Sequence, residues 1–355
     1  MTLPQLNLKH ELNTRIITEK VDIIRYLQIG INIPVIPELY NYILEDIKSY
    51  DAKAILLEEN INNERFKEYT DKVVGIVLLY DDHDDTLFFG FFGVYDHDRI
   101  KIEFLVEKVI EYAKENKYKR IRGPINIPTV IYGWGFMIEG SSKDLFIACP
   151  VNPPIYQEVF TDRGFHIKFE VDRYYVPGLK INPYKLSSYD FTEYEYINPG
   201  KERIWDVIDE MIELHINYQP PSAQITPKKS FNFKNFVDFI YTYGREWMIW
   251  IVNHKPSNKI VACGYVIPNI FHKDKHGRLD SISFHDWVVH PDHRRKGLAM
   301  LMYGETSLRG ISRKSKNYIR WGYWPVGSEN IASTKAALKM GGNKSKTHHI
   351  FEFEL

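Results

Sequence analysis

Cysteine is scarce in this sequence, with Cys149 and Cys263 the only two among 355 residues. Two thiols in a chain of this length argue against a disulfide scaffold and are typical of proteins from reducing compartments. Residues 1–10 contain no apolar segment of the kind that directs secretion, and no apolar run in the sequence is long enough to span a membrane. The sequence therefore predicts a cytoplasmic protein without a membrane partner.

The sequence also lacks net charge, because 46 lysines and arginines balance 46 aspartates and glutamates. A general nucleic-acid binder needs a large basic surface, so no nucleic-acid partner is expected. Hydrophobic residues make up 44% of the chain, which is enough to build a full core. Since 355 residues exceed the usual size of one compact domain, we expect two domains.

The stretch Val289–Ala299 reads V-H-P-D-H-R-R-K-G-L-A and is the most informative part of the sequence. An apolar strand end runs through a basic loop into a helix that starts near Leu298. Backbone N–H groups at a helix start attract phosphate, and Gly297 with the small Ala299 would let a pyrophosphate approach the main chain. Positive charge is added by Arg294, Arg295 and Lys296. The alternative is an ordinary strand-to-helix turn with a solvated basic surface.

The sequence on either side of this loop fits the phosphate-binding interpretation. Apolar residues alternate along a predicted strand, and their phase slips by one position at His285 and Asp286, as expected for a β-bulge. The alternating residues are Ile282 and Phe284 before the slip, and Trp287 and Val289 after it. Beyond the loop, helical spacing of apolar residues continues to Ile311, and Tyr318–Trp324 is predicted to be the next strand.

The loop resembles the acetyl-CoA signature of the GNAT acyltransferases, R/Q-x-x-G-x-G/A, with Arg294, Gly297 and Ala299 at its fixed positions. The resemblance implies a sheet in which a bulged fourth strand diverges from the fifth and leaves a slot for the pantetheine arm. It therefore implies acetyl-CoA as the acyl donor. The donor contacts that it implies here are Trp287, Val288, Val289, Arg294, Arg295, Lys296, Gly297, Leu298 and Ala299.

A last helix is predicted after Ser328, as its N-cap, and before Gly341 and Gly342. Its sequence resembles the second cofactor motif of the same family, N-x-x-A-x-x-x-Y-x-K-x-G, with Asn330, Ser333, Lys339 and Gly341 in register. The resemblance implies that Asn330 and Ser333 contact the donor.

The catalytic groups are less well defined by the sequence. The tyrosine that often protonates the leaving thiolate in this family is replaced by Ala337, and the nearby phenols are Tyr323 and Tyr303, which also fit as packing residues. The acceptor amine must lose a proton to a base. Because a bulge re-orients side chains, His285 or Asp286 is the candidate base. The alternative is that these two residues form a surface pair at a strand end.

The order strand, strand, helix, strand, helix, strand occurs twice along the chain. In the first half, the expected strands are Lys72–Tyr80, Thr86–Val94, Tyr118–Arg122 and Phe165–Val176, and the expected helices are Ile102–Lys114 and Pro154–Arg163. We therefore predict the α/β class of the α+β type, with two tandem GNAT-like domains at residues 1–180 and 190–355. Each domain is expected to be a twisted, mostly antiparallel mixed sheet flanked by helices. The junction is predicted near Pro177–Tyr189, where Pro, Gly, Asn and Ser collect.

The two repeats differ at the position of the phosphate loop. In the first half, Tyr95–Arg99 contains no glycine and is acidic, so it would repel phosphate. We expect domain 1–180 to be a degenerate GNAT-like domain without a phosphate loop, and domain 190–355 to be the acetyltransferase domain.

Two other groups of residues suggest bound cations. The run D-D-H-D-D at 81–85 lacks the spacing of a calcium loop and fits a solvated hairpin turn better. The histidine pairs His290 with His293 and His348 with His349 have no cysteine nearby and no H-E-x-x-H pattern. No metal is therefore expected.

Three functions of different classes remain. The first is a CoA-dependent N-acyltransferase that moves an acetyl group from acetyl-CoA to an amine of a small molecule or peptide in a ternary complex. The second is a non-catalytic acyl-CoA sensor or scaffold, suggested by Ala337 and the degenerate first half. The third is an aminoacyl transferase fed by charged tRNA, against which the neutral charge counts.

Overall fold

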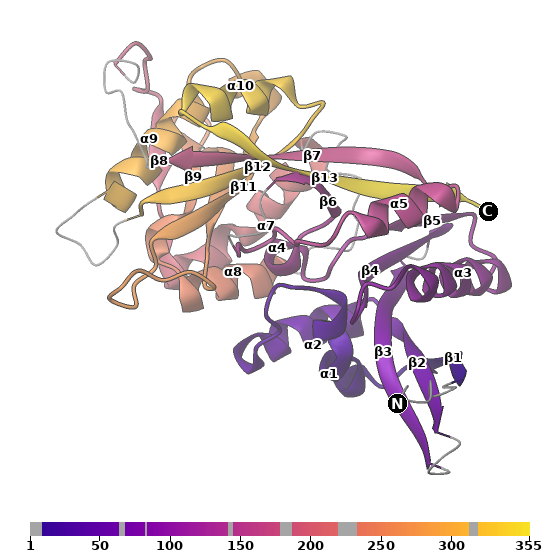
Figure 1. Ribbon diagram of the computed structural model, residues 1–355. Helices are drawn as coiled ribbons and strands as arrows, with labels where there is room; N and C mark the ends of the chain where they lie inside the picture. Colours follow the sequence, from indigo (N-terminus) through magenta and orange to yellow (C-terminus); the bar gives the residue numbers. More distant parts are fainter. Residues whose placement is uncertain are drawn as a thin grey trace. The chain divides into compact units, whose positions relative to one another are not determined.

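The computed structural model describes residues 9–63, 68–81, 84–140, 145–177, 187–218, 233–311 and 319–355. Contacts divide the chain into two compact units (Figure 1). Unit 1 comprises residues 1–138, 150–168 and 349–355, and unit 2 comprises residues 139–149 and 169–348. No helix among the described residues is long and apolar enough to cross a membrane.

Unit 1 contains one sheet with helices on both faces. Its elements are β1 (Lys9–Ile17), α1 (Lys20–Gly30), η1 (Pro37–Leu39), α2 (Tyr40–Ser49), β2 (Lys53–Asn63), β3 (Glu68–Asp81), β4 (Thr86–Val94), α3 (Arg99–Glu115), β5 (Arg120–Gly123), α4 (Thr129–Tyr132), β6 (Phe136–Gly140) and α5 (Ile155–Asp162). The strand order is β1-β2-β3-β4-β5, followed by the end of β13 (Asn343–Glu354). Strands β4 and β5 run parallel, and the other neighbours run antiparallel.

The core of unit 1 lies between the sheet and helices α3 and α5. Side chains from the strands and from both helices share one apolar cluster that includes Leu57, Val77, Leu79, Phe89, Leu105, Val109 and Phe160. Helices α1 and α2 lie on the other side of β3 from α3 (Figure 1). A Cβ at Gly30 would lie 1.8 Å from the carbonyl oxygen of Phe91, so the end of α1 can approach β4 only without a side chain there.

Unit 2 also has both parallel and antiparallel strand pairs. Its elements are β7 (His166–Pro177), β8 (Tyr194–Ile197), α7 (Gly200–Tyr218), α8 (Phe233–Tyr243), η3 (Glu246–Met248), β9 (Ile249–His254), β10 (Lys259–Pro268), β11 (Ser281–Val289), η4 (Pro291–His293), α9 (Leu298–Ile311), β12 (Trp321–Gly327), α10 (Ile331–Lys339) and the start of β13. The strand order is β8-β9-β10-β11-β12-β7. Strands β11 and β12 are parallel, and the other neighbours on this path are antiparallel.

The helices of unit 2 define two faces of its sheet. Phe284 of β11 stacks on Trp324 of β12 at 4.9 Å and lies near Tyr303 of α9, so we call this side the α9 face. The next residue along the strand, His285, pairs with Tyr265 of β10, whose ring lies 5.9 Å from that of His215 on α7. Because neighbouring residues of a strand point to opposite sides, we call this second side the α7 face.

The predicted order of elements is confirmed in both repeats, as β3-β4-α3-β5-α5-β7 and β10-β11-α9-β12-α10-β13, and so is the mixed α/β class. Most of β7 is assigned to unit 2 and the end of β13 to unit 1, an assignment that the sequence pattern did not indicate. The expected domain bounds and junction stay predictions, and residues 178–186 of the junction lie outside the described residues.

The predicted boundaries around β12 were wrong. Strand β12 begins at Trp321 and continues to Gly327, three residues beyond the expected end, because it pairs with β7 along this length. The following helix consequently starts later, and Asn330, rather than Ser328, is its N-cap. The early elements between residues 9 and 63 were not predicted.

Candidate functional site

The parallel strands β11 and β12 pair only at their first three positions and then separate. Their register joins Ser281 with Trp321, Ile282 with Gly322 and Ser283 with Tyr323. On the other side of β11, Cys263 is paired with Val288, while Tyr265 is paired with His285. Gly264 therefore faces two residues of β11, 286 and 287, which confirms the predicted bulge.

Tryptophan side chains fill the α9 face at the bulge. Trp287 packs 5.0 Å from Trp324 and 5.0 Å from Trp250, and its indole N–H donates to the carbonyl oxygen of Tyr265 at 3.2 Å. A Cβ at Gly264 would lie 2.8 Å from the Trp287 ring, so the bulge needs glycine on the neighbouring strand. Trp287, one of the expected donor contacts, is thus also a packing residue, while Val288 is buried in the strand.

The loop from His290 to Gly297 joins the end of β11 to the start of α9. Its turn contains two residues with left-handed backbone, Arg295 at φ +64° and Gly297 at φ +84°. The amides of Met300 and Leu301 donate to the carbonyl oxygen of Gly297 at 2.9 Å, so the amides just before them have no partner within the helix. The loop therefore presents main-chain donors at the positive end of the α9 dipole.

The three cations of the loop have different roles. Arg294 holds the loop in place, because its Nε donates to the carbonyl of Val289 at 3.0 Å and its Nη2 to that of Tyr218 at 3.3 Å. Arg295 and Lys296 are exposed beside the helix start, as is Ala299, whereas Leu298 is buried. The sequence thus predicted a group of residues that the structure brings together at one helix terminus.

Tyr189 is a neighbour of this loop that the sequence did not indicate. A Cβ at Gly297 would lie 2.5 Å from two atoms of the Tyr189 ring. Glycine is therefore required at position 297 for two reasons: its φ angle is positive, and the Tyr189 ring occupies the place of a Cβ.

Three histidines lie beside the loop. The His293 ring is 4.7 Å from that of His254 and 5.8 Å from that of His290, and its Nδ1 is 3.0 Å from the hydroxyl of Tyr194. Burial, together with the positive charges of His254 and Lys296, lowers the pKa of His293. Within the described ranges, no group of three or more His, Cys, Asp or Glu side chains is arranged to hold a metal ion.

Helix α10 lies on the same side as the tryptophans. Asn330 caps it by accepting from the amide of Ser333 at 3.1 Å, and the hydroxyl of Ser333 accepts from the indole N–H of Trp324 at 3.1 Å. Ala337 is buried, and its carbonyl oxygen accepts from the amide of Gly342 at 2.9 Å. Both expected donor contacts, Asn330 and Ser333, thus have structural partners as well.

Two of the candidate catalytic residues, His285 and Tyr323, lie on the α7 face near the point where β11 and β12 separate. His285 is buried at 5% exposure, and Tyr323 lies with its hydroxyl 3.3 Å from that of Ser345. Asp286 lies in β11 at the bulge, and its side chain is outside the described part of the structure. The fully buried hydroxyl of Ser283 has no hydrogen-bond partner among the described residues, and only its place in the strand alternation could have indicated it from the sequence.

Comparison with known proteins identifies the fold. No protein-family model matches the sequence, and no curated protein matches it. A tandem GNAT protein from the clavulanic acid biosynthesis pathway, solved without AcCoA, is similar with a TM-score of 0.59 over 97% of this chain and 98% of its own, at 11% identity. This chain has the tandem GNAT fold.

Other solved structures agree. A GCN5-related N-acetyltransferase from Sphaerobacter thermophilus has a TM-score of 0.52 at 11% identity and covers 99% of this chain and 97% of its own. A probable N-acyltransferase from Enterococcus faecalis V583 has a TM-score of 0.52 at 9% identity, over 98% of this chain and 73% of its own. At identities this low, structural similarity establishes the tandem GNAT fold alone. The reaction has to be argued from the site.

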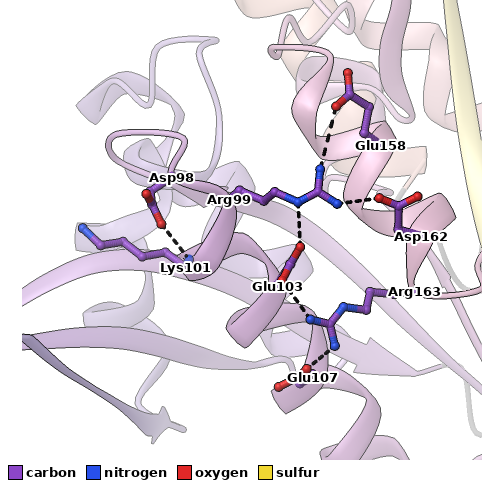
Figure 2. A network of polar contacts seen from close by, with 8 residues as sticks. All are labelled: Asp98, Arg99, Lys101, Glu103, Glu107, Glu158, Asp162 and Arg163. Atoms are coloured by element: carbon purple, nitrogen blue, oxygen red, sulfur yellow. Dashed lines mark hydrogen bonds and ion pairs between the residues drawn. The ribbon is translucent and has the colours of Figure 1, made fainter.

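Within this tandem GNAT fold, the position in unit 1 that corresponds to the α9 loop of unit 2 is occupied by capping and ion-paired side chains. Asp98 caps α3 by accepting from the amide of Lys101 at 3.1 Å (Figure 2). Arg99 is held by Glu103 at 2.7 Å and Asp162 at 2.5 Å, while Arg163 pairs with Glu103 and Glu107. The hydroxyl of Tyr156 accepts from the amide of Val94 at the end of β4 at 3.1 Å. The helix start and the strand end of unit 1 are thus both satisfied by side chains of unit 1.

Proposed function

We propose that the chain is a CoA-dependent N-acyltransferase, with acetyl-CoA as donor and an amine as acceptor. The observation that carries the proposal is the Gly297 turn, which starts α9 next to the point where β11 and β12 separate. The solved relatives named N-acetyltransferases support the same reaction class.

The residues present fit an acyl-CoA. The pyrophosphate would lie against the first amides of α9, with Arg295 and Lys296 adding charge. Arg294 already donates to two carbonyls, so its role is to hold the loop in shape. The pantetheine arm would follow the edge of β11 beyond Ser283, where β12 no longer pairs with it.

The reaction requires one proton acceptor and one proton donor. The amine nitrogen attacks the thioester carbonyl, the C–N bond forms and the C–S bond breaks. His285 takes the proton of the amine in this proposal, with Asp286 as the alternative base, and Tyr323 or water protonates the thiolate. A strand N–H near Val289 polarises the carbonyl oxygen.

The test is calorimetric titration of acetyl-CoA into the wild type and two variants at low and at physiological salt. Gly297→Asp should abolish binding, because it places a carboxylate at the helix start. That variant also conflicts with Tyr189 and with the φ angle, so its folding must be checked. The double variant Arg295→Glu with Lys296→Glu changes exposed side chains only and should weaken binding about 100-fold, most strongly at low salt.

A matched control is Lys117→Glu, at an exposed position after α3 in unit 1, which should leave the affinity unchanged. Wild type that binds no acetyl-CoA, or a double variant with wild-type affinity, would contradict the donor site.

The second candidate is a non-catalytic acyl-CoA sensor, favoured by the buried Ala337 at the position of the family's tyrosine. Tight acetyl-CoA binding without thiol release over a broad amine panel would select it. Release of CoA with even one amine would exclude it.

A further inference from the structure

Strand β1 is the outer strand of the sheet in unit 1 (Figure 1). Among the described residues it pairs only with β2, in an antiparallel register that runs from Lys9 opposite Asn62 to Ile17 opposite Ala54. Every second residue of an edge strand directs its N–H and C=O groups away from the sheet, so β1 presents a row of main-chain donors and acceptors. The outer strand of unit 2, β8, has only four residues. An edge as long as β1 can accept a further strand.

The exposed charges on β1 alternate in sign. Glu11, Asn13 and Arg15 are exposed, and as alternate residues of a strand they share one face. Arg15 Nε donates to Glu58 of β2 at 2.9 Å, while 51% of the Arg15 side chain stays exposed. Glu11 and Arg15 lie at equal distances along the strand on either side of Asn13. Edge charges of one sign would keep two copies of a strand apart, whereas opposite charges placed symmetrically about one residue allow them to pair.

We propose that β1 pairs with β1 of a second copy of this chain, antiparallel and about a two-fold axis at Asn13. In this register each Glu11 lies opposite the Arg15 of the other copy, so that the same charge pair forms twice, as in any two-fold interface. A shift of the register by two positions in either direction removes both pairs. The charges of β1 therefore select one register.

The second face of β1 supports the same pairing. Leu12 packs against the apolar core of unit 1, whereas Ile16, on the same face, is 52% exposed. With the axis at Asn13, Leu12 lies opposite the second copy's Thr14, and Ile16 lies diagonal to the second copy's Leu12, within reach of a cross-strand contact. The second copy thus covers the exposed side chain of Ile16 and continues the apolar row of this face across the interface.

The experiment measures the mass of the chain by sedimentation equilibrium at micromolar to submillimolar concentrations. The wild type should pass from 41.9 kDa to twice that mass as the concentration rises. Glu11→Arg places like charges opposite each other, and so does Arg15→Glu. Each variant alone should dissociate about tenfold more readily than the wild type or more. An equal mixture of the two should recover the dimer, because a chain with two arginines then faces a chain with two glutamates.

The mixture also serves as a control for folding. Arg15→Glu loses its ion pair with Glu58, so its thermal midpoint is compared with that of the wild type. A variant that fails to associate because it is misfolded would not dimerise with its partner variant either. Glu115→Arg, a charge reversal at the exposed end of α3, should associate as the wild type does.

Cysteine cross-linking tests the register. Directly opposed residues of antiparallel strands have Cα atoms about 4.5 to 5.5 Å apart, a separation that a disulfide spans. Oxidation with copper phenanthroline should therefore link Asn13→Cys into covalent dimers. The wild type provides the background, since Cys149 and Cys263 are buried. Thr14→Cys should link far less, because its two copies would stand two residues apart along the strands.

Three results would overturn the proposal. The first is a wild type that remains at 41.9 kDa over the whole concentration series. The second is a dimer that both charge variants retain, which would place the interface elsewhere on the chain. The third is cross-linking that is no stronger for Asn13→Cys than for Thr14→Cys. None of these measurements involves acetyl-CoA, so the outcome is independent of the proposed function.

Discussion

The two units of this chain differ at the start of corresponding helices, α3 in unit 1 and α9 in unit 2. In unit 1, helix α3 begins at a capping carboxylate, Asp98, and its first arginine is held by Glu103 and Asp162. In unit 2, helix α9 begins at Leu298, directly after Gly297, and Arg295 and Lys296 are exposed beside it. A side chain that caps a helix start occupies an amide that could otherwise bind an anion, whereas a helix start preceded by glycine keeps its amide donors available. The same fold can thus carry a capped helix start in one unit and an uncapped helix start at the corresponding place in the other.

The units also differ in the charged groups that they bury. Unit 1 buries the carboxyl group of Asp46, and unit 2 buries Arg173 and Lys346. Burial and the nearby charge of Glu45 raise the pKa of Asp46 to about 7. The carboxyl group of Asp46 can become neutral near neutral pH, whereas a guanidinium keeps its charge. The difference can be tested in each unit separately.

The largest expected effect is on the pH dependence of stability, through Asp46→Asn. Between about pH 4 and 7 the carboxyl is ionised in the unfolded chain and protonated in the folded one. The wild type therefore loses unfolding free energy as the pH rises through this window, by about 3 kcal/mol between pH 5 and 8. Asparagine does not titrate, so the variant should lose less over the same interval. The measurement is denaturant unfolding at both pH values.

Glu45→Gln serves as the control, because Glu45 is exposed and acts on Asp46 only through its charge. It should change the pH dependence slightly and in the same direction. Parallel stability curves for the wild type and Asp46→Asn would show that Asp46 is not the titrating group.

The next largest effect is the loss of stability when a helix cap is removed. Asp98→Ala should destabilise the chain by about 1 kcal/mol, since the amide of Lys101 loses its acceptor, and should leave acetyl-CoA affinity unchanged. Asn330→Ala should have a similar effect on stability, because Asn330 caps α10. If Asn330 also contacts the donor, its loss should in addition weaken acetyl-CoA binding several-fold.

Asn330→Asp separates the two roles, because aspartate caps a helix as well as asparagine does. It should keep the stability while lowering the affinity for the anionic donor. Unchanged affinity in both Asn330 variants would restrict this residue to capping. Chemical denaturation and acetyl-CoA titration are the two measurements.

Sequence pattern alone predicted the elements whose contacts are local. The fully buried strand β4 has the predicted bounds, and α9 includes Leu298 and Ile311, whose apolar spacing predicted a helix. The bulge could be read from the slip at His285 and Asp286, since side-chain alternation records which face of a strand is buried. The loop residues were found because phosphate binding demands a particular set of residues at a helix start.

Features that depend on distant strand pairing could not be predicted. The end of β12 at Gly327 follows from pairing with β7, about 150 residues earlier in the chain. Arg173 and His348 meet for a related reason, because they belong to strands that end different repeats. In the sequence each of them is one charged or polar residue within an alternating strand, so nothing there indicates that they contact each other.

The smallest expected effect concerns His293 beside the open helix start. Burial and the positive charges of His254, Lys296 and His290 lower its pKa below the ordinary value of 6.5. The unfolded chain then binds a proton more readily than the folded one, so this group contributes stability above about pH 6.5 that is lost as the pH falls. His293→Asn should reduce that acid sensitivity, as measured by thermal unfolding at pH values about one unit above and about one unit below the ordinary histidine pKa. His276→Asn, at an exposed position in the turn before β11, should behave as the wild type does. Acetyl-CoA should restore stability at the lower pH, because its phosphates would offset the positive charge that His293 adds beside the α9 terminus.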